Sequence, residues 1–183
     1  QAKERALAEI IPKERHDNDL LSDAMALQQH QQLGHKKPTQ FYRASNDKQI
    51  TELIIPVLTT EGYGGEMSLI VGIKKDASLS GVRVLSHSET PGLGDKIERR
   101  KSEWILQFDG KSLQNTSEEQ WQVKKDGGVF DQFTGATITP RAIVKAIHGS
   151  LRYFNQHRDS LLAVAPTNQT TDPNKDASKS TKP

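Results

Sequence analysis

The amino-acid sequence predicts a single α+β domain in which helices pack on an antiparallel β-sheet. At 183 residues, the chain has the length of one domain with a proper hydrophobic core. Apolar residues alternate along several short segments in the middle of the chain, as they do in strands, and follow helical spacing near its two ends. The strand segments are not separated by regular helices, so antiparallel pairing is expected rather than parallel βαβ units.

The first forty residues are charged and rich in Gln and His, and we expect them to lie on the surface of the domain or to lead to it. Leu7, Ile10 and Ile11 repeat at helical spacing until Pro12 stops the pattern. The chain begins inside this pattern, so we expect that a segment upstream has been removed. The only other helix-like apolar spacing in this part is that of Leu20, Ala24 and Leu27.

Strands are predicted from Phe41 onward. The first is a strongly apolar run that we expect to end near Pro56, because proline cannot donate a ladder hydrogen bond. After a glycine turn at residues 62–65, residues 66–86 are predicted to form a β-hairpin that turns around Ser80 and Gly81. Its first strand is expected to be half-buried, with alternation at Met67, Leu69, Val71 and Ile73. Further strands are predicted at 104–108 and 121–124, where Trp104 and Trp121 are expected to be core aromatics.

The clearest element is a C-terminal helix. Thr139 is its expected N-cap, and Pro140 stands at the favoured first helical position. Its apolar face consists of Ile143, Ile147, Leu151 and Phe154. Beyond Pro166 no large apolar residue is present, which predicts a disordered tail. The expected division is an N-terminal helical or linker segment (1–40), a main domain (41–165) and this tail (166–183).

Composition excludes several classes of function. Lys and Arg total 25 against 23 Asp and Glu, mixed along the chain, so nucleic-acid binding gets no support. Cysteine is absent, which excludes disulfides, thiolate chemistry and iron–sulfur ligation. The six histidines form no metal-binding pattern, and no hydrolytic constellation can be argued from spacing.

The segment 131–137, D-Q-F-T-G-A-T, carries the strongest chemical signal. Its last residue, Thr137, places a hydroxyl just before a helix N-terminus, where backbone N–H groups and the helix dipole favour a phosphate by about 0.3 to 1 kcal/mol. The small residues Gly135 and Ala136 permit a close approach to this hydroxyl. Position and spacing alone are also explained by a threonine-rich loop that merely caps the helix.

A second candidate segment is Glu89-Thr90-Pro91-Gly92-Leu93-Gly94-Asp95. With Pro91 at the second position and Gly92 at the third, it predicts a type II turn, which by itself implies no function. His87, two residues before Glu89, is expected to lie near any ligand of this loop.

The complete pattern D-x-x-[ST]-G-A-[ST], expected by chance in roughly one chain of this length per thousand, resembles the flavinylation motif of the FMN-binding domain family. In that family a flavin transferase moves FMN from FAD onto the last Ser or Thr, here Thr137. The continuation to Pro140 and Arg141 is similar to the G subunits of the Rnf (Rsx) complexes. The resemblance covers residues 62–154 and the stretch 6–12, which in the family follows a single membrane helix. The glycine turn at 62–66 is interpreted as scaffold.

The resemblance implies an electron-carrying subunit of an ion-translocating oxidoreductase, with FMN bound covalently by a phosphoester and no independent turnover. Its implied partners are the other subunits of the Rnf (Rsx) membrane complex and, during maturation, a flavin transferase. It implies a periplasmic domain that one N-terminal helix holds at the bacterial cytoplasmic membrane. The implied complex couples ferredoxin and NAD redox chemistry, or reduction of the SoxR sensor, to ion movement. The implied flavin contacts are Asp131, Thr134, Gly135, Ala136, Thr137, Glu89, Thr90, Pro91, Gly92, Leu93 and Gly94.

Two alternatives stay open. The C subunit of the sodium-pumping NADH:quinone reductase shares the T-G-A-T part of the motif but usually lacks the Pro-Arg continuation. A non-redox periplasmic binding or assembly module, in which Thr137 belongs to a capping loop, is the alternative from a different class.

Overall fold

The structure is a computed structural model that describes residues 2–163. Its helices and strands are α1 (Ala2–Ile10), β1 (Met25–Ala26), β2 (Gln40–Asn46), β3 (Gln49–Gly62), β4 (Gly65–Lys74), β5 (Leu79–Ser86) and α2 (Ile138–Leu162). Short 3-10 helices lie in the connections: η1 (Lys13–Arg15), η2 (His30–Leu33), η3 (Gly94–Ile97), η4 (Trp104–Phe108), η5 (Glu118–Gln120) and η6 (Lys124–Asp126).

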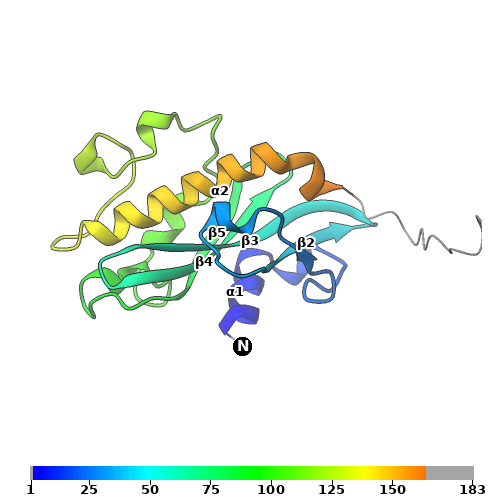
Figure 1. Cartoon of the computed structure of the whole chain (residues 1–183), viewed down its shortest axis with the longest axis horizontal. Helices are drawn as coiled ribbons and strands as arrows, with labels where there is room; N and C mark the ends of the chain where they lie inside the picture. Colours follow the sequence, from blue (N-terminus) through cyan, green and yellow to red (C-terminus); the bar gives the residue numbers. More distant parts are fainter. Residues whose placement is uncertain (1, 164–183) are drawn as a thin grey trace, which may run out of the picture.

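The strands form one antiparallel sheet in the order β1-β2-β3-β4-β5, which confirms the predicted α+β class. The long helix α2 crosses one face of the sheet, and α1 lies on the opposite face (Figure 1). Among the described helices, none combines the length and the apolar character needed to cross a membrane.

The two faces of the sheet belong to separate hydrophobic clusters, because successive side chains of a strand point to opposite sides. On β3, Leu53 and Ile55 join the larger cluster under α2, whereas Ile54 joins the smaller cluster under α1. On β4 the predicted alternation is present, but Ile70 is also buried, on the α1 side. The expectation of a half-buried strand was therefore wrong, since α1 covers the second face.

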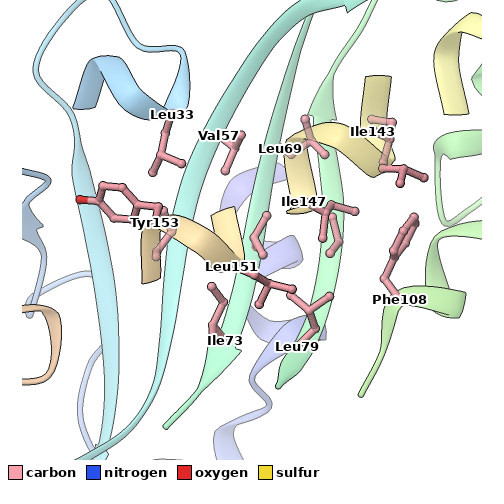
Figure 2. Close-up of a cluster of buried hydrophobic side chains, with 14 of the residues drawn as sticks. Leu33, Val57, Leu69, Ile73, Leu79, Phe108, Ile143, Ile147, Leu151 and Tyr153 are labelled. Carbon is pink, nitrogen blue, oxygen red and sulfur yellow. The ribbon is translucent and has the colours of Figure 1, made fainter. Parts of the chain in front are cut away.

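The predicted apolar face of α2 is confirmed, and it packs against β3 and β4. Figure 2 shows Ile143, Ile147 and Leu151 pointing into the cluster formed with the sheet. On the other side of the sheet, α1 buries Leu7 and Ile10, as its spacing predicted.

The first long strand does not end at Pro56. It continues to Gly62, and Pro56 pairs with Ile70 in the β3–β4 register. The Pro56 carbonyl oxygen faces the other side, 2.8 Å from His35 Nε2, beyond the last residue pair with β2 at Tyr42 and Ile54. Because the N and O of a strand residue face the same side, the missing N–H breaks no ladder hydrogen bond.

The β4–β5 hairpin was predicted correctly, but its turn was misplaced. The turn lies at residues 75–77, where Ala77 has a φ of 72°, and Ser80 and Gly81 lie within β5. Gly81 pairs with Gly72, and a Cβ at Gly72 would lie 2.4 Å from a methyl of Ile10. These glycines thus permit α1 to approach the sheet closely. From the sequence alone, Gly81 had been interpreted as part of a turn.

Segments 104–108 and 121–124 are not strands. The first forms η4, and in the second only Val123 pairs, in an isolated bridge with Phe130. Aromatic rings hold these turns in a row with centroids 4.7 to 5.3 Å apart. The row consists of Phe133, Trp104, Phe108, Phe130, Trp121 and His148. Both tryptophans are thus core residues, as predicted.

Residues 20–27 form no α-helix, despite their spacing. Leu20 and Leu27 are buried in different clusters, and Met25–Ala26 pairs with β2 as β1. Just before them, Asn18 covers the edge of β2 through hydrogen bonds from the Ser45 N–H and to the Arg43 carbonyl. The predicted tail at 166–183 lies outside the described residues.

Candidate functional site

The two candidate segments meet around one pocket of about 510 Å³ at the beginning of α2, although about forty residues separate them in the sequence. Predicted residues that line this pocket are Thr90, Leu93, Gly94, Gly135, Ala136 and Thr137. It is also lined by Tyr63, Ile138, Thr139 and Arg141, which were not among the predicted contacts.

Thr137 occupies the N-cap position of α2, and Thr139 lies inside the first turn, so the predicted N-cap was wrong. The Thr137 backbone is already helical, with φ −95° and ψ −31°, and its side chain caps no backbone N–H. The hydroxyl therefore remains available on the pocket wall. The N–H groups of Ile138 and Thr139 have no acceptor inside the helix and add to the positive end of its dipole.

Thr139 is bound to the floor of the site instead. Its hydroxyl, almost fully buried, donates a 2.5 Å hydrogen bond to Glu89 Oε1. The same carboxylate accepts the backbone N–H groups of Tyr63 at 3.0 Å and Gly64 at 2.7 Å. Glu89 is itself 5% exposed, and it connects the β3–β4 turn, the second candidate loop and α2 at one point.

The loop 90–93 is the predicted β-turn. The Leu93 N–H donates to the Thr90 carbonyl at 3.0 Å, and Gly92 has the positive φ of 79° that a type II turn requires at its third position. Behind it, Asp95 Oδ1 accepts the Gly92 N–H at 2.9 Å, and Oδ2 lies 2.6 Å from Lys101 Nζ. The hydrogen bond from Lys101 lowers the pKa of Asp95, which keeps this acceptor charged.

A second tight turn precedes Thr137. Phe133 and Ala136 form a bridge around Thr134 and Gly135, and Gly135 has a φ of 80°, which explains the glycine of the motif. A Cβ on Gly135 would lie 3.7 Å from Leu93 Cδ2, so the two loops are in contact at this point.

Exposed apolar side chains gather around the pocket. Tyr63 is 72% exposed, Ile138 49% and Leu93 42%, and all three line it. They are three of the five large hydrophobic side chains that are exposed within residues 2–163. Their concentration beside a polar hydroxyl gives the site the mixed surface that a flat, partly apolar ligand with a phosphate requires.

Arg141, on the first turn of α2, adds a positive charge to the lining of the pocket. Its guanidinium holds the Asp126 carboxylate in two hydrogen bonds of 2.7 Å each, which lower the pKa of Asp126 and raise that of Arg141. The ion pair orients Arg141 at the side of the pocket and connects the Pro-Arg continuation to η6.

The other candidate residues do not line the pocket. Asp131 lies 2.6 Å from Lys124 Nζ and is exposed, as is Thr134. Pro91 and Gly92 form the outer side of their turn, while the side chain of Glu89 lies beneath it. His87 binds Glu98 at 2.6 Å and accepts the Glu89 N–H at 3.0 Å, so it supports the loop from behind.

Sequence reasoning missed Tyr63, because the glycine turn at 62–66 was fully explained as scaffold. The available signal was an aromatic residue between glycines in a turn, where a large apolar side chain is expected to be exposed rather than packed in the core. Among residues 2–163, no group of three or more His, Cys, Asp or Glu side chains is placed to hold a metal ion.

Comparisons with known proteins agree with this geometry. Residues 62–152 match the family model described as FMN-binding domain. The chain is 48% identical over 157 residues to a Vibrio cholerae serotype O1 protein named as the G subunit of an ion-translocating oxidoreductase complex, covering 86% of this chain and 75% of the relative. Proteins of the same name from Shewanella loihica and Aliivibrio fischeri are 48% identical, with 86% and 74% coverage, and 44% identical, with 86% and 75% coverage.

The chain belongs to this family of G subunits. The FMN-binding domain match begins at the β3–β4 turn and ends within α2, so it encloses every residue that lines the pocket. The pocket fits FMN, the group that the domain is named for. Its size, its exposed apolar rim and a Thr137 hydroxyl that makes no capping hydrogen bond suit a flavin with a phosphate. The relatives carry the name of the ion-translocating complex rather than that of a sodium-pumping quinone reductase. Their names therefore favour the G subunits over the C subunit of the quinone reductase.

Proposed function

We propose that this chain is an electron-transfer flavoprotein subunit of an ion-translocating oxidoreductase complex, with FMN attached covalently to Thr137. The observation that carries the proposal is the Thr137 hydroxyl, which caps no backbone N–H of α2 and lies on the wall of a pocket inside the FMN-binding domain match. A threonine that serves only as a helix cap accepts a hydrogen bond from the first turn, and Thr137 accepts none. This favours an attachment site over the capping loop of a non-redox module.

Attachment is a phosphoryl transfer from FAD. A bond forms between Thr137 Oγ1 and the flavin-side phosphorus, the pyrophosphate bond of FAD breaks, AMP leaves, and the hydroxyl proton is released. A separate flavin transferase supplies the catalysis, so the chain needs no base of its own. Its contribution is the helix N-terminus, whose N–H groups and dipole stabilise the remaining negative charge of the diester.

The residues around Thr137 divide the task of holding the cofactor. Tyr63, Leu93 and Ile138 provide apolar surface for the ring system. Thr90 and Gly94 of the second loop line the same pocket. Glu89 and Thr139 act from below by fixing both walls relative to α2. Of the proposed contacts, Thr134, Pro91 and Gly92 contribute through the shape of the two turns, whereas Asp131 forms an ion pair with Lys124 before the second turn.

Bound FMN supplies one- and two-electron redox chemistry, while the protein fixes its position and environment. The broad exposure of the rim suits exchange of electrons with other subunits rather than turnover of a small substrate inside the chain. As a subunit of the complex, the domain is proposed to lie on the periplasmic side of the cytoplasmic membrane, with residues 41–165 as the FMN-binding unit and an N-terminal membrane helix upstream.

The test is co-expression of the chain with a flavin transferase. We expect yellow protein, in-gel flavin fluorescence after denaturation and the mass of one FMN less water. Thr137→Ser should retain all three and Thr137→Val should lose them, while Thr60→Val, at an exposed threonine outside the motif and the pocket, should behave as wild type. An unmodified wild-type chain in the presence of active transferase would exclude the covalent flavoprotein.

A further inference from the structure

Another cavity, of about 340 Å³, is lined by His87 and Glu98, which flank the segment that contains the 90–93 turn. It is bounded by α1, β5 and residues 98–100. The charged side chains that line it include four arginines and only two glutamates: Arg5, Arg83, Arg99, Arg100, Glu9 and Glu98.

Two of these arginines are neutralised locally. Arg83 Nε lies 2.8 Å from Glu9, and Arg100 Nε lies 3.0 Å from Glu98, which also binds His87. Arg5 and Arg99 are exposed and form no salt bridge with any described residue. The cavity therefore has an excess of positive charge, although the whole chain has a formal net charge of only +2.

The floor between these cations is small and apolar. Ala2 and Ala6 of α1 and Val84 and Leu85 of β5 line the cavity. Guanidinium groups bind phosphate oxygens through paired N–H donors, and an apolar floor accommodates the carbon atoms of a phosphate ester. The arrangement is compact rather than a long basic stripe, which argues against a nucleic-acid track.

We propose that this surface binds the phosphate headgroups of an anionic phospholipid membrane. The basis is charge complementarity: a cluster of arginines around a headgroup-sized cavity, on a chain that is otherwise nearly neutral. His87 and Glu98 line this cavity, and the chain between them forms one wall of the Thr137 pocket. Docking here holds that pocket close to the lipid surface, and the binding itself does not depend on the flavin.

The test is co-sedimentation of the chain with vesicles of phosphatidylglycerol and phosphatidylcholine, with pure phosphatidylcholine vesicles for comparison. We expect binding to the anionic vesicles that decreases as salt is added. Each arginine near an anionic surface contributes a factor of about five, so Arg5→Ala combined with Arg99→Ala should weaken partitioning by about thirtyfold. Neither substitution removes a salt bridge between described residues, and thermal unfolding should be unchanged.

The matched control combines Lys36→Ala with Lys37→Ala, which removes the same charge from two exposed residues outside the cavity. It should lose far less binding than the arginine variant. Equal losses in the two variants would show that net charge alone attracts the chain, and would overturn the proposed site. Failure of the wild-type chain to bind anionic vesicles at low salt would also overturn it, and would leave an acidic protein as the partner of this surface. Displacement by glycerol phosphate at concentrations similar to the lipid phosphate would instead identify a site for free anions.

Discussion

Replacing Thr139 by valine tests the junction on which the pocket depends. Valine has nearly the same shape as threonine but lacks the hydroxyl, so the substitution removes the 2.5 Å hydrogen bond to Glu89 without creating a large cavity. Both side chains are buried, and Glu89 then keeps only the backbone donors of Tyr63 and Gly64. The carboxylate loses its only contact with α2 among the hydrogen bonds of the described residues.

The expected loss of stability follows from the kind of hydrogen bond. A hydrogen bond to a charged acceptor contributes about 1.5 to 3 kcal/mol. Thr139 is only 1% exposed, so bulk water does not replace the lost donor. For a domain of this size, each kcal/mol corresponds to a decrease in Tm of about 2 to 4 °C. The valine variant should therefore unfold about 3 to 12 °C below the wild type.

Differential scanning calorimetry and chemical denaturation measure this loss, with Thr139→Ser as the matched control. Serine keeps the donor and should recover most of the stability, although it loses one buried methyl group, at a cost of about 1 kcal/mol. A valine variant as stable as the wild type, or a serine variant as unstable as the valine variant, would refute the assigned role of the hydroxyl.

Gly94, His148 and Tyr63 provide further tests. Gly94→Ala should cost about 1 to 3 kcal/mol, because its Cβ would lie 2.8 Å from the buried Thr139 hydroxyl; an unchanged denaturation midpoint would contradict this. Burial, followed by the charge of Arg152, lowers the pKa of His148, so the unfolded chain binds its proton first as pH falls. That contribution to stability is present above the unfolded pKa of about 6.5 and is lost as pH falls through this value toward the lower folded pKa. His148→Gln should therefore reduce the dependence of Tm on pH in this window. A slope of Tm against pH identical to that of the wild type would contradict the role of His148. In flavin-loaded protein, Tyr63→Ala should shift the flavin absorbance and increase its quenching by iodide without changing the attached mass, whereas Tyr63→Phe should retain the wild-type spectrum.

The sequence predicted those parts of the fold whose pattern has one physical explanation. The face of α2 and the alternation on β4 were readable, because each period matches one secondary structure. Pro56 was misread, because a strand end and an unpaired strand side have the same local signal, and only the extent of β2 distinguishes them. The segment 104–108 was misread because its buried residues, Trp104, Ile105 and Phe108, are spaced one and three apart, which also suits a short 3-10 turn.

The candidate site was predictable as two loops but not as one pocket. Gly92 was recognisable because a type II turn requires a positive φ at its third position, which is a local property. Gly135 was selected for its small size, and the turn that gives it a positive φ was not predicted. The role of Glu89 depends on partners 25 and 50 residues away, so nothing near it in the sequence indicates a buried junction. Tyr63 was missed for the same reason, since the folding of the β3–β4 turn over the start of α2 is a tertiary event.

The most direct test of the central claim is tandem mass spectrometry of the chain after co-expression with a flavin transferase. The proposed attachment site predicts a single FMN phosphoester on Thr137 in wild-type protein, and no flavin on the peptide from Thr137→Val. An FMN located on Thr134 or Thr139, or a flavin that remains attached when Thr137 is replaced by valine, would contradict it.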